Sequence, residues 1–247
     1  MKHILLYLLI ASSSFLKSQE RNEEINMVGD FNTLNVYAGI EVNLIKSKEN
    51  KIILSDKNKD FSVFGYKVKN KVLKLRVEID KKLSLGKIFV DVYYNNEIDA
   101  VNLFQGSKLF LKTPLIQTYI NIKVQEGSSF EGKVTTDKTN IMVASGGSIN
   151  IEGASAVLDI KATTGGVCSA EHLSSEQTKI KASIGSVVYA KASVLMDAKA
   201  STGAIIRVYG SPKKFYYKST LFGSVKVMKQ KSQLKSSSGG YIEEVKQ

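Results

Sequence analysis

The sequence predicts an all-β fold, a parallel β-helix-like solenoid with coils of roughly 20 residues. Three observations support this prediction. The 247 residues include 18 Gly, only 2 Pro and no Trp, and Val, Ile, Thr and Tyr are abundant, which favours strands. Several segments alternate apolar and polar residues, as strands with one buried face do. Glycine-marked corners recur at nearly constant spacing in the second half of the chain, which is typical of a stacked repeat.

The first 18 residues have the features of a signal peptide. Lys2 and His3 precede an apolar run from Ile4 to Ala11, and a serine-rich stretch follows up to Ser18. The run is shorter than the roughly 20 apolar residues that a membrane-spanning helix needs, and no later segment is apolar enough. We therefore expect an exported protein, in the periplasm, on the outer membrane surface or outside the cell, with no membrane span after signal removal.

Residues 28–100 are the strand-rich N-terminal part of a predicted domain that covers residues 28–228. Apolar and charged residues alternate strictly from Leu73 to Ile79, the pattern of a strand with one buried face and one solvent-exposed face. The other strands expected in this part cover residues 34–37, 42–45, 52–54 and 89–93. We expect these strands to cap one end of the solenoid, because an exposed sheet edge invites unwanted strand addition.

Residues 101–228 carry the glycine-marked repeats. The predicted corner glycines follow one another at spacings of 20, 18, 20, 18 and 20 residues: Gly127, Gly147, Gly165, Gly185, Gly203 and Gly223. Small residues precede most corners and a short apolar strand follows, so we expect roughly six coils stacked at about 4.8 Å per turn, with small side chains inside. Glycine at each corner permits positive φ. Residues 229–247 are rich in Lys, Gln and Ser, which predicts a flexible polar tail.

The chain resembles the head GIN domain family, described as putative auto-transporter adhesins and common in Bacteroidetes. The resemblance covers residues 28–228 and includes residues 31–36, 39–42 and 73–79, the Ser145-Gly146-Gly147-Ser148-Ile149 corner and Gly210-Ser211-Pro212. The family usually has paired glycines at its corners, whereas the corners after Gly165-Gly166 keep one. The resemblance implies a β-helix-like solenoid and an adhesive role.

The charge of the chain favours anionic partners. The net charge is +12, which falls to +10 when Lys2 and Lys17 leave with the signal. Only three of the basic residues are Arg, the residue preferred for bidentate phosphate and base contacts, so we expect no nucleic-acid partner. Three lysines lie four residues before a corner glycine and a fourth is one place out of register: Lys161, Lys181, Lys199 and Lys218. Stacked coils would align them into a basic ladder, either splayed into solvent or paired with anionic glycans or other envelope components.

Candidate catalytic residues are few. His172 is the one histidine outside the signal, four residues after Cys168, and Glu171 is a nominal residue to orient it. A four-residue separation on a strand and turn does not ensure the contact that a Cys/His nucleophile pair requires. We expect Cys168 to be a buried thiol. Asp159 and Asp197 are isolated acids, and no glycine-rich phosphate loop is present. We therefore predict no catalytic residues, no cofactor and no metal site.

The predicted function is a non-catalytic, exported binding scaffold or adhesin that presents one solenoid face. Two alternatives remain open: a polysaccharide-acting β-helix enzyme, which needs converging carboxylates, and a structural protein that self-associates as a homo-oligomer. Two tyrosine pairs, Tyr93-Tyr94 and Tyr216-Tyr217, are either sugar-stacking platforms or packing residues of the caps and edges.

Overall fold

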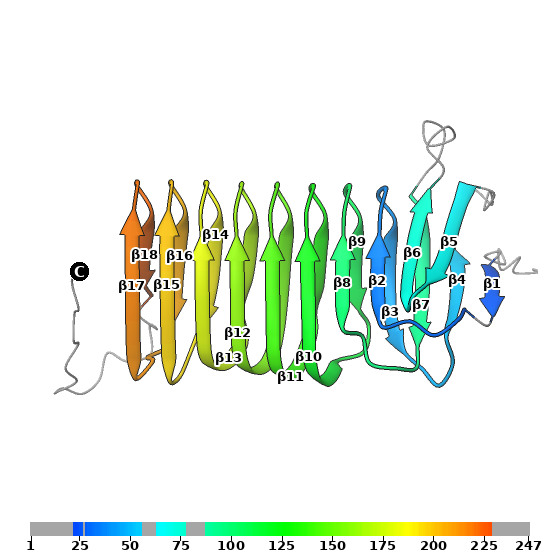
Figure 1. Ribbon diagram of the computed structural model, residues 1–247, viewed down its shortest axis with the longest axis horizontal. Coiled ribbons are helices and arrows are strands. Elements are labelled where there is room, and N and C mark those ends of the chain that lie inside the picture. Colours follow the sequence, from blue (N-terminus) through cyan, green and yellow to red (C-terminus); the bar gives the residue numbers. More distant parts are fainter. Residues whose placement is uncertain (1–21, 27, 56–62, 78–86, 229–247) are drawn as a thin grey trace, which may run out of the picture.

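The protein is a rod of stacked β-coils, as the computed structural model in Figure 1 shows. The model describes residues 22–26, 28–55, 63–77 and 87–228. About seven turns of about 19 residues fill the chain between residues 100 and 227, preceded by mixed strands, which confirms the predicted β-solenoid. The predicted signal (1–18), the predicted tail (229–247) and the last two residues of the predicted strand 73–79 lie outside the described residues.

The strands run along two faces of the rod, and three long strands bend from one face to the other. These long strands are β11 (Ser129–Val143), β12 (Ser148–Ala162) and β13 (Val167–Ala182). The first face contains their C-terminal halves together with β5 (Phe64–Lys69), β6 (Val72–Val77), β2 (Thr33–Val36), β8 (Ala100–Leu103), β10 (Leu115–Val124), β15 (Leu195–Ser201) and β17 (Lys214–Thr220). The second face contains their N-terminal halves with β1 (Asn22–Asn26), β4 (Lys51–Ser55), β7 (Phe89–Tyr94), β3 (Glu41–Lys46), β9 (Lys108–Leu111), β14 (Val187–Lys191), β16 (Ile205–Tyr209) and β18 (Ser224–Val227).

Successive coils pair in parallel, so equivalent residues form columns along the rod. One interior column contains Val143, Ala162, Ala182 and Ala200, which pair in that order. The same column continues upstream through Leu103 and Val124, and all six side chains are buried. Small side chains therefore fill this column in the later coils, as expected, whereas the earlier coils hold larger ones.

The coils turn at the upper edge of the rod through two consecutive residues with positive φ. In the turn around Ser145 and Gly146, for example, φ is 50° and 71°, and the amide of Gly147 donates to the Ala144 carbonyl at 2.9 Å. This is the pattern of type I′ turns, which favour glycine at the second central position. The turns also bind one another, because the amide of Gly146 donates to the Thr164 carbonyl of the next coil at 3.1 Å.

Two of the predicted corner glycines are one residue away from the column of positive-φ glycines. Gly127, Gly165, Gly185 and Gly203 lie in this column, as does Gly106 upstream. The equivalent residue in the third coil of the series is Gly146 and not Gly147, since Ser129 pairs with Ser148. In the last coil Phe222 holds the position, with φ of 65°, and Gly223 follows it. Gly147 and Gly223 instead lie close to the backbone of the preceding coil. A Cβ added at Gly147 would lie 2.7 Å from the Val124 carbonyl oxygen, and one added at Gly223 would lie 2.4 Å from the Ala200 carbonyl oxygen.

At the lower edge the long strands bend around buried hydroxyl groups. Thr136, Ser155 and Ser175 form a column in register, and Thr136 Oγ1 donates to Ser155 Oγ at 3.0 Å. Ser155 Oγ in turn donates to the Val157 carbonyl at 2.9 Å. These bonds satisfy polar groups where the chain leaves one face for the other, which a buried bend requires. Gly153 lies at the same bend, with φ of 112°.

The N-terminal strands both extend the stack and close its end. The β2–β3 coil lies between β8–β9 on one side and β6–β7 on the other, with parallel pairing on both sides. Beyond it, β5 pairs antiparallel with β6, β4 with β7, and β1 with β4. The antiparallel strands thus form the outer end, while β2 and β3 belong to the stack itself. The described part of the chain contains no helix with the length and hydropathy that a bilayer crossing requires.

Candidate binding face

The four predicted lysines form one continuous column on the outside of the first face. Lys161 pairs with Lys181, Lys181 with Lys199, and Lys199 with Lys218, so we call these four residues the lysine column. The prediction that Lys218 is one place out of register is wrong. The turn of that coil is formed by Leu221 and Phe222, so the position equivalent to the corner glycines is Phe222, four residues after Lys218, and not Gly223.

The lysine column is an exposed line of like charges. All four lysines are exposed. The described residues contain one ion pair to this column, between Lys199 Nζ and Asp197 Oδ2 at 3.8 Å. Neighbouring coils are about 4.8 Å apart, and two unit charges at that distance in water repel by about 0.9 kcal/mol. A polyanion lying along the column would relieve this repulsion.

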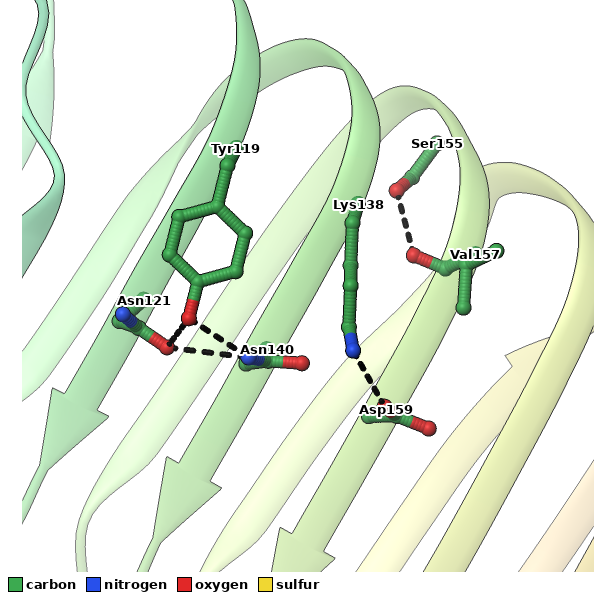
Figure 2. Close-up of polar contacts among 7 residues, drawn as sticks. All are labelled: Tyr119, Asn121, Lys138, Asn140, Ser155, Val157 and Asp159. Atoms are coloured by element: carbon green, nitrogen blue, oxygen red, sulfur yellow. Dashed lines mark hydrogen bonds and ion pairs between the residues drawn. The ribbon is translucent and has the colours of Figure 1, made fainter.

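A second outward column lies beside the lysine column and is mixed in character. Six residues in register form it, and we call it the polar column: Asn121, Asn140, Asp159, Lys179, Asp197 and Tyr216. Figure 2 shows its N-terminal part, where Asn140 Nδ2 donates to Asn121 Oδ1 at 3.1 Å and to the Tyr119 hydroxyl at 2.8 Å. Lys138 Nζ lies 3.4 Å from Asp159 Oδ2. Amide, hydroxyl and carboxylate groups thus stand next to the lysines.

Some residues of this face were not predicted. Lys123 pairs with Met142, and Met142 pairs with Lys161, so Lys123 stands in the line of the lysine column two coils upstream. Its Nζ lies 5.5 Å from the centre of the Phe104 ring. The spacing rule could have found Lys123, because it lies four residues before Gly127. The polar column has no such sequence signal, since its members differ in type from coil to coil.

The structure separates the residues of the nominal Cys/His pair. Cys168 is fully buried in the core, whereas His172 is exposed and pairs in register with Glu152. Burial, and to a smaller extent the charge of Glu171, raise the pKa of the Cys168 thiol to about 12. A β-bulge between Ser169 and His172 adds the extra residue in this strand. Asp159 and Asp197 stand two coils apart in the polar column, with Lys179 between them.

Cys168 is expected to resist alkylation in the folded protein. The thiolate is the reactive form, and a pKa near 12 leaves about a thousandfold less thiolate at neutral pH than an ordinary thiol has. Mass spectrometry after iodoacetamide treatment should show modification in urea and almost none in buffer. Equal alkylation rates in the two conditions would contradict the burial of this side chain.

The two tyrosine pairs have different positions. Tyr94 is buried in the core, and Lys51 Nζ lies 5.0 Å from the centre of the Tyr93 ring. Tyr216 faces outward at the end of the polar column and is 50% exposed, while Tyr217 stands in the inner column behind Ala198 and stacks on Phe215. Of the four tyrosines, Tyr216 is therefore the one that stands in the polar column.

The comparison with protein families identifies the chain. The model of the family "Putative auto-transporter adhesin, head GIN domain" matches residues 30–212. The chain belongs to the head GIN domain family. The family model covers the lysine column as far as Lys199, and β17 and β18 continue the same stack beyond its end. No curated protein matches the chain.

Solved structures resemble this head GIN domain in fold. A putative adhesin from Bacteroides fragilis has a TM-score of 0.76 and 14% identity, with 84% of this chain and 96% of that chain covered. A putative adhesin from Parabacteroides merdae has a TM-score of 0.66 and 16% identity, over 85% and 96%. A putative lipid binding protein from Parabacteroides distasonis has a TM-score of 0.64 and 14% identity, again over 85% and 96%. At such identities the likeness establishes the fold alone.

Proposed function

We propose that this head GIN protein is an exported, non-catalytic adhesin-type scaffold that binds anionic glycans of a cell envelope along the lysine column. The observation that carries the proposal is the alignment of Lys161, Lys181, Lys199 and Lys218 in four successive coils. A row of cations at one fixed spacing suits a polymer with repeated negative charges. The neighbouring polar column offers amide, carboxylate and ammonium groups to the hydroxyls of such a polymer.

The binding role is favoured over a polysaccharide-acting enzyme by the arrangement of the acids. Asp159 is ion-paired with Lys138, Asp197 is ion-paired with Lys199, and Lys179 stands between the two aspartates in their column. Glycoside hydrolysis uses two carboxyl groups that flank the same bond. Export is supported by the family description and by the signal-like residues 1–18. Fractionation of the native cells, with the mature N-terminus read by mass spectrometry, tests that part.

The test of binding is retention on an anionic polysaccharide resin such as heparin. The triple variant Lys161→Gln, Lys181→Gln, Lys199→Gln is expected to bind about tenfold more weakly than the unchanged protein, since three exposed charge pairs at about 0.5 kcal/mol each contribute about 1.5 kcal/mol together. Raising the ionic strength from 0.15 to 1 M should release the unchanged protein, because the Debye length falls from about 8 Å to about 3 Å.

A matched control removes the same charge from the other face of the rod. Lys133, Lys191 and Lys226 lie on β11, β14 and β18 of that face. The variant with these three lysines changed to Gln should bind as the unchanged protein does, and neutral dextran should retain none of the proteins. Equal weakening by the two triple variants would mean that net charge alone, and not the lysine column, is responsible.

A further inference from the structure

The C-terminal end of the binding face is hollowed. A shallow depression of about 330 Å³ is lined by residues of the paired strands β15 and β17: Leu195, Asp197, Lys199, Tyr216, Tyr217 and Lys218. The two strands pair in parallel at the end of the stack (Figure 1). The volume is at the small end of the range for ligand sites, which begins at about 300 Å³. It suits one small cyclic molecule better than a length of polymer.

The side chains around the depression are of three complementary kinds. The Tyr216 ring supplies an aromatic surface, half exposed, and Leu195 and Tyr217 add apolar lining. Lys199 and Lys218 supply ammonium groups, and Asp197 supplies a carboxylate that lies 3.8 Å from Lys199 Nζ. An aromatic ring offers an apolar face to a ligand, cations attract a negative group, and a carboxylate accepts hydrogen bonds from hydroxyls. Together these groups match an anionic sugar.

Tyr119, another tyrosine on this face, differs from Tyr216 in its contacts. The Tyr119 hydroxyl is hydrogen-bonded to both Asn121 and Asn140 and is only partly exposed. Within the part of the chain that the structure describes, no hydrogen bond engages the Tyr216 hydroxyl, and Lys218 has no ion pair. Tyr119 is therefore tied into the surface of the protein, while Tyr216 and Lys218 keep their ring face and charge for a ligand.

We propose that this depression is a subsite for one anionic sugar ring, carrying a carboxylate or a sulfate. The ring stacks on Tyr216, the anionic group lies between Lys199 and Lys218, and ring hydroxyls donate to Asp197. This inference rests on the proposed function, because the subsite would hold one unit of the glycan whose remaining charges lie along the lysine column. It adds selectivity, since a line of lysines alone accepts any polyanion.

Monosaccharides test the subsite separately from the polymer. Saturation-transfer NMR with galacturonic acid, galactose 6-sulfate and galactose should show binding of one or both acids and not of galactose, which has the same ring without the charge. Tyr216→Ala should weaken the acid at least about fivefold, as loss of an aromatic contact does. Lys218→Gln should weaken it similarly, and Tyr216→Phe should keep it. Tyr66→Ala, at a tyrosine of similar exposure (44%) on β5, should change nothing.

The outcomes separate the two proposals. The double variant Lys161→Gln, Lys181→Gln leaves the depression intact, so it should lose affinity for heparin and keep its affinity for the monosaccharide. If heparin binds through the column but no acidic monosaccharide binds, or if Tyr216→Ala binds as the unchanged protein does, the subsite is wrong and the proposed function stands. If the monosaccharide binds and the double variant keeps full affinity for heparin, the lysine column is wrong and the subsite stands alone.

Discussion

Gly153→Ala is expected to lower the free energy of unfolding by about 4 kcal/mol. Gly153 has φ of 112°, a backbone region that is almost restricted to glycine, and an added Cβ would lie 2.0 Å from the Val134 carbonyl oxygen of the adjacent coil. That oxygen is backbone and cannot rotate away. The bend of β12 and its pairing with β11 must therefore distort together. Urea denaturation followed by far-UV circular dichroism measures the loss.

Gly146→Ala is the matched control for this prediction. Gly146 also has positive φ, 71°, but no heavy atom lies within 4 Å of the position of an added Cβ. Its cost is therefore conformational, about 1 kcal/mol for a single left-handed residue. A loss of equal size in the two variants would show that the contact with Val134 does not limit position 153.

Phe130→Ala is expected to cost about 3 to 5 kcal/mol, the usual range for removing a buried aromatic ring. Phe130 is buried and stands in an interior column between Leu109 and Ile149 of the adjacent coils. Removing the ring leaves a cavity. Each coil of a solenoid contacts only its neighbours, so only the two adjacent coils can move to fill it. The shift of the urea midpoint measures the cost.

The neighbouring phenylalanine of the same face provides the comparison. Phe110 points outward in the column of Glu131, and Lys112 Nζ lies 5.5 Å from the centre of its ring. Phe110→Ala should cost no more than about 1 kcal/mol, the size of an exposed cation–π contact. If Phe110→Ala were the more damaging change, the assignment of inner and outer columns in β9 and β11 would be reversed.

The lysine column could be predicted from the sequence because lysine and turn keep a constant separation in each coil. Lys161, Lys181 and Lys199 each precede a glycine that has positive φ, and counting from that glycine gives the correct register. The count fails at Lys218 because Phe222 takes the place of glycine in its turn. It also fails at Gly147, since two consecutive glycines leave open which one turns the chain. A pattern of residue types marks a corner only to within one residue.

The pairing of the N-terminal strands could not be predicted in the same way. Alternation in the strand from Leu73 shows which side is buried, and the structure confirms this for β6. Alternation says nothing about which strand lies next, and β2 lies beside β6 and β8, which come much later in the chain. The depression at Tyr216 could not be predicted either, because Asp197 and Lys199 of β15 meet Tyr216 and Lys218 of β17 only through the pairing of these two strands.

The position of the β2–β3 coil has a consequence for the order of assembly. Thr33 pairs with Val72 and with Ala100, 39 and 67 residues away, whereas the later coils pair at separations of about 19 residues. Contacts between distant residues slow folding, because a long loop must close before they form. We therefore expect the coils of the C-terminal half to form one after another, soon after that part of the chain has been synthesised. The N-terminal end should complete its strand pairing last, because β2 and β3 insert between the β6–β7 and β8–β9 coils, which are synthesised after them.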